Sequence, residues 1–205
     1  MLTIVNYGVG NLASIKNMLK KINCDAIISS EESDIIKADK LILPGVGHFD
    51  NCMQMFHASG LYEKVQQKII GEKIPVLGIC VGCQMLLEKS EEGTEHGLGW
   101  IKGEVKKFDQ QQMPENLKIP HMGWTDVELN KSSLLFKNMY DEPRFYFVHS
   151  YYPTLTDEKD VLLYANYGYP FAAAVEHENI MGVQFHPEKS HKYGMKLLEN
   201  FVKNY

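Results

Sequence analysis

The most informative residues of the chain are a cysteine and, far downstream, a histidine and a glutamate. Cys80 lies in residues 76–82, VLGICVG, where an apolar run is followed by a Gly-x-Cys-x-Gly turn and then by a helical pattern. Small residues on both sides of the cysteine are typical of a sharp strand-to-helix turn, because the backbone at a displayed nucleophile is strained and larger neighbours would collide there. A helix N-terminus also favours the thiolate form. The pattern therefore predicts that Cys80 is a nucleophile.

The downstream partner is the sequence QFHPE at residues 184–188, which follows an apolar, strand-like run. Pro187 fixes its own φ angle and holds the preceding residue extended, so the side chains of His186 and Glu188 can lie on one side of the turn. The carboxylate would then hold the imidazole tautomer, while His186 would take the proton of Cys80 and later return it to a leaving amine. Cys80, His186 and Glu188 are therefore predicted to form a catalytic triad for acyl transfer through a thioester.

A second hypothesis for the same segment is redox chemistry. Cys80 and Cys83 form a C-x-x-C motif after a strand, as in dithiol oxidoreductases. The glycine before Cys80 and the downstream HPE sequence would have no use in a dithiol couple, so the nucleophile interpretation is favoured. Cys83 is then expected to pack within the first helical turn, and the substitution Cys83→Ala is expected to keep most of the activity.

Residues 44–47, PGVG, follow the third strand-like run. A plain turn between a strand and a helix would account for two glycines and a proline. The functional interpretation is that the backbone of Gly45, Val46 and Gly47 approaches a substrate carbonyl and supplies one oxyanion donor, while the N–H of Val81 supplies the other. The turn YGVGN at residues 7–11 lacks the patterns of a nucleotide loop. The remaining histidines show no metal-ligand spacing, so neither a metal nor a cofactor is predicted.

Hydrophobic periodicity predicts an α/β fold that would position these residues. In the first half of the chain, strand-like runs alternate with helical patterns. The strand-like runs cover residues 2–5, 26–28, 40–43 and 74–79, and the helical patterns cover 12–22, 33–38, 49–56, 62–70 and 84–88. Such alternation predicts βαβ units, and hence a mostly parallel central sheet with helices on both faces.

The pattern changes after Gly97, where strand-like runs follow one another with only turns between them. These runs cover residues 100–108, 125–129, 144–152, 161–165, 171–176 and 180–184, and an amphipathic helix closes the chain at about 192–204. We expect an antiparallel or mixed section added to the parallel sheet. No internal repeat or convincing linker is visible, so residues 1–205 are expected to form a single domain.

Composition and charge exclude several function classes. A chain of 205 residues with 44% hydrophobic residues can bury a full core. The net charge of −5, without a basic stripe, argues against nucleic acid as a partner. No apolar run reaches the roughly 18 to 20 residues of a membrane span, and the strand-like N-terminus does not resemble a signal peptide. Four cysteines make no disulfide scaffold, so a reducing cytoplasm is expected.

Four motifs make the chain resemble the class I, triad-type glutamine amidotransferases. They are LPGVG at residues 43–47, GICVGCQ at 78–84, FVHSY at 147–151 and FHPEKS at 185–190. The resemblance covers the chain essentially from end to end, with no synthase domain attached. It implies that L-glutamine is the substrate, that Cys80 attacks its side-chain amide and releases ammonia, and that water hydrolyses the resulting glutamyl thioester.

The resemblance also implies roles for residues that spacing alone does not reveal. Residues 44–47 would supply a mobile oxyanion donor. Four residues would bind the amino-acid end of glutamine or lie close to it: Gln84, Glu92, Ser150 and Tyr151. Three residues would lie at a partner interface, near the point where ammonia leaves: Trp124, Tyr146 and Lys189.

The identity of the ammonia-accepting partner stays open between two classes. The usual partner in the most similar subgroup is a (β/α)8-barrel cyclase, which uses the ammonia to make imidazole glycerol phosphate in histidine biosynthesis. Two stretches look more like paralogues that supply an ATP-dependent sugar amidotransferase in bacterial surface-glycan synthesis: RFYF at residues 144–147 and SHKYGM at residues 190–195. Thr125, where the family commonly has Asn, is a further departure from the family pattern.

Two further hypotheses concern the activity itself. A free-standing γ-glutamyl hydrolase would use similar cysteine and histidine chemistry, and rapid turnover of glutamine by the isolated chain would favour it. A binding module without catalysis is disfavoured, because all three members of the predicted triad are present.

Overall fold

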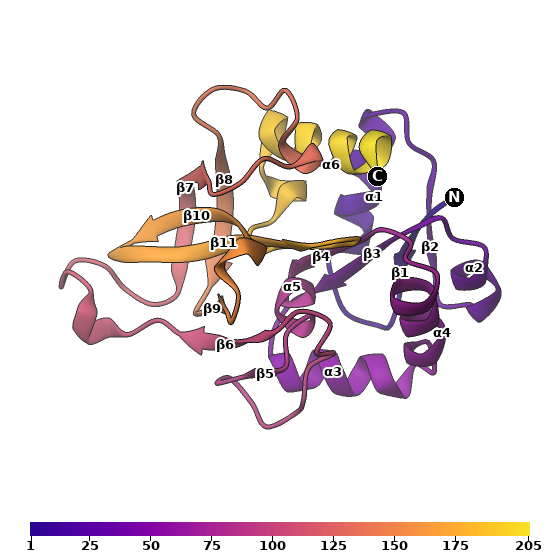
Figure 1. The fold of residues 1–205 in the computed structure, drawn as a ribbon, viewed down its shortest axis with the longest axis horizontal. Coiled ribbons are helices and arrows are strands. Elements are labelled where there is room, and N and C mark those ends of the chain that lie inside the picture. Colours follow the sequence, from indigo (N-terminus) through magenta and orange to yellow (C-terminus); the bar gives the residue numbers. More distant parts are fainter.

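A twisted nine-stranded sheet forms the centre of the computed structural model, which describes residues 1–205 (Figure 1). In spatial order its strands are β2 (Ala26–Ser29), β1 (Leu2–Val5), β3 (Lys40–Gly45), β4 (Val76–Cys80), β12 (Ile180–Val183), β11 (Tyr169–His177), β10 (Val161–Tyr167), β7 (His121–Leu129) and β8 (Arg144–His149). The first five are parallel, and antiparallel pairing begins at β11. A smaller sheet contains β5 (Lys89–Ser90), β6 (Gly103–Lys107) and β9 (Tyr151–Leu155). The predicted parallel sheet with an antiparallel section is therefore confirmed.

Helices cover both faces of the parallel half of the sheet (Figure 1). On one face lie α1 (Leu12–Lys21) and α6 (His191–Asn204); on the other lie α3 (Phe49–Ala58), α4 (Tyr62–Gln66) and α5 (Val81–Met85), with α2 (Glu32–Ile36) near the end of the sheet at β2. Short turns of 3-10 helix are η2 (Gln110–Gln112), η3 (Leu134–Phe136), η4 (Glu158–Asp160) and η5 (Pro187–Lys189). None of the helices combines the length and hydrophobicity that crossing a lipid bilayer requires.

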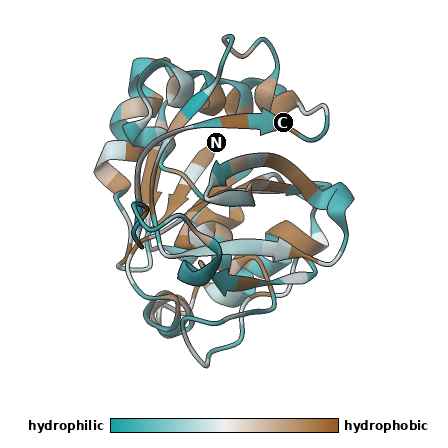
Figure 2. Cartoon of the chain, turned by 90° about the vertical axis from the view of Figure 1, so that its left-hand side faces the viewer, coloured by the Kyte–Doolittle hydropathy of each residue, from teal (hydrophilic) through white to brown (hydrophobic).

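The core forms where the apolar strands meet the inner faces of the helices. Figure 2 shows hydrophobic residues gathered on strands and inward helix turns, and hydrophilic residues in the loops. All four residues of β1 are buried, as expected for a strand covered on both faces. In α6 the buried apolar residues Leu197, Leu198 and Phe201 recur at helical spacing. One cluster of 52 buried residues extends through both halves of the chain, so the parallel and antiparallel sections share a continuous core.

Three predicted elements differ in the structure. The helix expected at residues 84–88 is α5, which begins directly after Cys80 and ends at Met85. The helix expected at 62–70 changes to a π-helical turn at Gln67–Gly71. The strand expected at 144–152 is two strands, β8 and β9, which separate at Ser150 and pair in different sheets. Periodicity missed this break because the strand-like character continues across Ser150.

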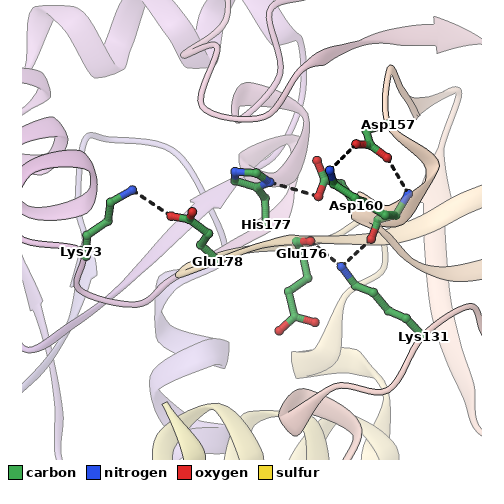
Figure 3. A network of polar contacts seen from close by, with 8 residues as sticks. Lys73, Lys131, Asp157, Asp160, Glu176, His177 and Glu178 are labelled. Atoms are coloured by element: carbon green, nitrogen blue, oxygen red, sulfur yellow. Dashed lines mark hydrogen bonds and ion pairs between the residues drawn. The ribbon is translucent and has the colours of Figure 1, made fainter.

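A polar network closes the turn between β11 and β12 (Figure 3). His177 Nδ1 lies 3.0 Å from Asp160 Oδ1, and the ammonium of Lys131 donates to the carbonyls of Lys159 and Glu176 at 2.7 Å each. These contacts join the end of β11 to η4. They lie at the amino end of β12, the opposite edge of the sheet from Cys80. The network therefore supports strand pairing rather than the chemistry of the predicted site.

Candidate active site

Cys80 occupies the tip of the turn between β4 and α5. Its backbone angles, φ +57° and ψ −115°, are strained for a residue with a side chain. The turn also requires glycine on both sides. A Cβ atom at Gly82 would lie 1.9 Å from the carbonyl oxygen of Leu43, and a Cβ atom at Gly78 would lie 2.6 Å from the carbonyl oxygen of Gly82. The backbone therefore has the strained strand-to-helix turn that the glycine pattern predicts.

The parallel pairing of β4 with β12 brings the histidine to the cysteine. Val183 lies opposite Ile79 in this pairing, so the segments that follow the two strands meet at the same edge of the sheet. His186 Nδ1 lies 2.8 Å from Glu188 Oε1, and the side chains of both residues are almost entirely buried. Because Nδ1 is directed to the carboxylate, Nε2 is the ring nitrogen that is available to interact with the thiol of Cys80.

The surroundings of His186 favour its charged form. Burial opposes protonation of the ring, but the hydrogen bonds and charges of Cys80 and Glu188 outweigh it and raise the pKa of His186 to about 10. An imidazolium at neutral pH can donate a proton to a leaving group, and it stabilises an adjacent thiolate. The arrangement is therefore equipped for nucleophilic catalysis with a general acid.

A cavity of about 350 Å³ lies over Cys80. Most of its lining residues belong to the predicted site: Val46, Gly47, Cys80, Val81, Gln84, Glu92, Ser150, Tyr151, His186 and Lys189. Three others were not predicted: Pro120, Val148 and His149. Four predicted residues do not line it: Gly45, Trp124, Tyr146 and Glu188. The cavity thus collects residues from both halves of the chain around one thiol.

Two side chains at the cavity offer acceptors for a cationic group. Gln84 Nε2 donates to Gln184 Oε1 at 3.0 Å and to the carbonyl of Tyr151 at 3.2 Å, which leaves the buried Gln84 Oε1 without a donor. Glu92 Oε2 accepts the N–H of Phe49 at 2.8 Å, at the start of α3. This contact holds the Glu92 carboxylate in place at the cavity. Together the two residues suit an ammonium group.

Residues 44–47 run alongside the turn that carries the cysteine. Gly45 pairs with Cys80 at the end of the β3–β4 ladder, and a Cβ atom at Gly45 would lie 2.5 Å from the backbone nitrogen of Gly82. The hydroxyl of Tyr7 donates to the carbonyl of Pro44. The thiol of Cys52 donates to the carbonyl of Val46 at 3.4 Å. The side chains of Tyr7, in the turn after β1, and of Cys52, in α3, thus hold this segment in place.

The three residues assigned to a partner interface lie together beside the cavity. The rings of Trp124 and Tyr146 meet edge to face with centroids 6.2 Å apart, and the ammonium of Lys189 lies 5.9 Å from the centroid of Tyr146. His191 stacks on Trp124 at 5.4 Å. Trp124 is nevertheless 42% exposed. Exposed aromatic residues of this kind are typical of surfaces that bind another protein.

The structure places Cys83 apart from the cavity. It is fully buried in α5, and burial raises the pKa of its thiol far above the usual value. All four cysteines are free. A buried, protonated Cys83 is a poor partner for a redox couple, so the geometry favours acyl transfer. No group of three or more His, Cys, Asp or Glu side chains is placed to hold a metal ion.

Sequence reasoning missed three buried polar residues: Gln184, His121 and His149. Gln184 is fully buried, and its Nε2 lies 4.0 Å from Cys80 Sγ. The sequence did contain a signal for Gln184. Side chains alternate in direction along an extended backbone, so residue 184 points to the same side as His186, two positions later. His121 and His149 face each other across β7 and β8. Their pairing had no signal in the sequence, because no tight turn joins the two strands and fixes their register.

Comparison with known proteins gives the same family over the whole chain. Residues 3–205 match the family "Glutamine amidotransferase class-I". Imidazole glycerol phosphate synthase subunit HisH 2 of Methanococcus maripaludis is 49% identical over 203 residues, which cover 99% of each chain. The HisH subunit of Leptospira borgpetersenii is 48% identical over 202 residues, which cover 98% of this chain and 99% of that protein.

Solved structures show the same fold at low sequence identity. A glutamine amidotransferase superimposes with a TM-score of 0.76 at 17% identity, covering 98% of this chain and 97% of that chain. Another glutamine amidotransferase, from Thermotoga maritima, gives a TM-score of 0.68 at 15% identity, covering 98% of this chain and 96% of that chain. Fold, family match and relatives agree. The chain therefore belongs to the class I glutamine amidotransferase family.

Proposed function

We propose that this chain is the glutaminase subunit of an imidazole glycerol phosphate synthase and hydrolyses L-glutamine to glutamate and ammonia for histidine biosynthesis. The observation that carries the proposal is the buried His186–Glu188 pair beside a strained Cys80. It occurs in a chain nearly half identical to HisH subunits over almost their whole length. Residues 1–205 act together as one glutaminase domain.

The first step breaks the side-chain amide bond of glutamine. Cys80 Sγ, as the thiolate, attacks the amide carbon, and the carbonyl oxygen becomes an oxyanion. The N–H of Val81 and one N–H from residues 45–47 donate hydrogen bonds to this oxygen. His186, protonated because its pKa is raised, gives its proton to the departing nitrogen. Ammonia leaves, and the glutamyl group remains on Cys80 as a thioester.

The second step restores the enzyme. His186, now neutral, takes a proton from a water molecule, which attacks the thioester carbon. The carbon–sulfur bond breaks, glutamate departs, and Cys80 returns to the thiolate beside a protonated His186. Glu188 keeps Nδ1 of His186 as the donor to its carboxylate in both steps, so Nε2 stays available for the reacting atoms.

Gln84 and Glu92 hold the amino-acid end of the substrate. The ammonium group of glutamine supplies the donor that Gln84 Oε1 lacks, and it pairs with the carboxylate of Glu92. Ser150 and Tyr151 line the same cavity and complete the wall of the binding site. A buried acceptor without a partner is costly, so the hydrogen bond that the substrate donates to it contributes favourably to binding.

The exposed cluster around Trp124 is the proposed contact with a (β/α)8-barrel cyclase subunit. Ammonia released into bulk water would be protonated and lost, so the exit beside Tyr146 and Lys189 must be sealed by the partner. The relatives named above are synthase subunits. The sugar amidotransferase partner has no support of this kind, only the sequence features at residues 144–147, Thr125 and residues 190–195. We place the enzyme in the cytoplasm, because a catalytic thiol among free cysteines needs a reducing compartment.

The proposal is tested by measuring glutamate release by the purified chain, alone and with the cyclase subunit of the same organism. We expect slow turnover alone and a clear increase when the cyclase binds its own substrate. The substitution Cys80→Ala is the control for contaminating glutaminases. Unchanged turnover on adding a cyclase that demonstrably binds would contradict the proposal. Rapid turnover by the isolated chain would favour a free-standing hydrolase instead.

A further inference from the structure

A chain of hydrogen bonds runs from strand β7 to the wall of the cavity. Thr125 Oγ1 lies 2.7 Å from His121 Nε2, and His121 Nδ1 lies 2.9 Å from His149 Nε2. His149 Nδ1 lies 2.8 Å from the carbonyl oxygen of Tyr151. The reaction steps above use neither Thr125 nor the two histidines, although both histidines are buried.

The carbonyl of Tyr151, at one end of this series of hydrogen bonds, fixes the direction of every bond in the series. The carbonyl of Tyr151 can only accept, so His149 Nδ1 carries a proton and donates. In a neutral ring His149 Nε2 then accepts, which makes His121 Nδ1 a donor and His121 Nε2 an acceptor. Thr125 must therefore donate its hydroxyl proton to His121. Both rings are Nδ1–H tautomers. Thr125 donates to His121, His121 donates to His149, and His149 donates to the carbonyl of Tyr151.

The surroundings keep both rings neutral. His121 stacks between Phe147 and Tyr167, with centroid distances of 4.9 and 4.1 Å. His149 lies 5.2 Å from the ring of Phe171. Burial lowers the pKa of His121 to about 4 and, with the neighbouring His121 acting in the same direction, that of His149 to about 3. The series of hydrogen bonds from Thr125 through His121 and His149 to the Tyr151 carbonyl is thus a relay that carries no charge at neutral pH.

The Tyr151 carbonyl at the end of the relay also determines how the Gln84 amide is oriented. It accepts from Gln84 Nε2 as well as from His149, and Gln184 Oε1 accepts from the same Gln84 nitrogen. With Nε2 directed to these two oxygens, Gln84 Oε1 is the atom left free as an acceptor. If the Tyr151 carbonyl turned away, one of the two contacts that hold this orientation would be lost.

We propose that Thr125, His121 and His149 are positioning residues for glutamine binding, which fix the Tyr151 carbonyl and through it the orientation of the Gln84 amide. The inference rests on the proposed function, because it takes Gln84 as a contact of the substrate. None of the three residues touches the reacting atoms. Their loss should therefore weaken binding of glutamine and leave the reactivity of Cys80 intact.

The kinetic test compares Thr125→Val with Thr125→Ser. Valine has nearly the same shape but no donor, so His121 Nε2 loses its partner, whereas serine keeps the hydroxyl. Loss of one such hydrogen bond should raise the KM for glutamine about fivefold in Thr125→Val, with kcat and the rate of Cys80 alkylation by iodoacetamide almost unchanged. Thr125→Ser should behave as the unaltered protein. Equal kinetics for the two variants, or a loss in kcat alone, would overturn the proposal.

A second variant and a spectroscopic measurement keep the test independent of catalysis. His121→Phe retains the ring stacking and removes the donor to His149, so its KM should rise more than that of Thr125→Val. Nitrogen-15 NMR of the histidine rings should show two neutral Nδ1–H tautomers from about pH 5.5 to about 8.5. An Nε2–H tautomer, or titration in that range, would refute the relay. If the unaltered chain lacked glutaminase activity even with the cyclase subunit and its substrate, the proposed function would fail, while the NMR result would still decide the relay.

Discussion

At the scale of single residues, the charge on His186 depends on Cys80 and on the carboxylate of Glu188, which has no other polar contact in the structure. Glu188 Oε1 contacts His186 Nδ1, while Glu188 Oε2 is buried without any partner. An isolated buried carboxylate would be costly, so the imidazolium is what makes its charge tolerable. The contact with His186 is therefore the one polar contact that the structure gives to the Glu188 side chain.

This dependence predicts a shift in the pH profile when Glu188 is replaced by glutamine. The carboxylate raises the pKa of His186, so its removal lets the ring lose its proton at lower pH. The alkaline limb of the kcat/KM profile for glutamine should move to lower pH in Glu188→Gln, and kcat should fall at least tenfold. Glu92→Gln serves as the matched control, because it should raise KM without moving that limb. An alkaline limb at the same pH in Glu188→Gln would argue against the assignment.

The two cysteines of the C-x-x-C motif should differ sharply when each is replaced by alanine. Cys80→Ala should abolish glutamate release and labelling by a glutamine-like electrophile. Cys83→Ala should keep most of the activity, since its thiol is buried away from the cavity, and should lower the free energy of unfolding by about 1 kcal/mol. Activity assays and urea unfolding measure both effects. A loss of activity in Cys83→Ala as complete as in Cys80→Ala would revive the redox hypothesis.

At the scale of elements, the close approach of β3 to the turn after β4 leaves no room for a side chain. The substitution Gly82→Ala places a methyl group on the Leu43 carbonyl oxygen, so backbone must shift. We expect a loss of about 2 kcal/mol or more in the free energy of unfolding, together with loss of glutaminase activity. Gly71→Ala is the control, because the nearest atom to its added methyl group would lie 3.9 Å away. Equal stability of the two variants in urea would contradict this account.

The sequence predicts those elements and site residues that have local signals. The glycines around Cys80 and the proline after His186 indicate backbone geometry directly, and the alternation of strands and helices predicts the parallel sheet. The break at Ser150 has no local signal, because both strands are equally strand-like and only their sheets differ. The same holds for His121 and His149, which meet through a register that depends on long-range pairing.

At the scale of the whole molecule, the two neutral buried histidines make stability depend on pH. Their pKa values in the folded protein are lowered to about 4 and about 3, whereas the unfolded chain titrates near the usual value of about 6.5. Below about pH 6.5 the unfolded state therefore binds protons that the folded state does not. The contribution of these two histidines to stability is complete above that pH and falls as the pH drops toward 4, by up to about 1.4 kcal/mol per pH unit for each histidine.

Urea unfolding at several pH values measures this dependence. His121→Phe removes one of the two groups and should flatten the acid-side slope by about the contribution of one histidine. The carboxylates contribute equally to both proteins, so the difference between the slopes isolates the relay. An unchanged slope in His121→Phe would show that His121 binds its proton over the same pH range in the folded and unfolded states, contrary to a lowered pKa.

The pairing of β4 with β12 also has a consequence for the protein during its synthesis. Gln184 and Cys80 meet in the folded chain although they are 104 residues apart. At about 5–20 residues per second, a ribosome makes the nucleophile roughly 5–20 s before the segment that carries its base. A nascent or prematurely terminated chain thus displays a thiol without the histidine that would supply a proton to the departing nitrogen. Ammonia release begins only after β12 and the turn beyond it have been translated and folded, so fragments left by stalled ribosomes do not drain the glutamine pool of the cell.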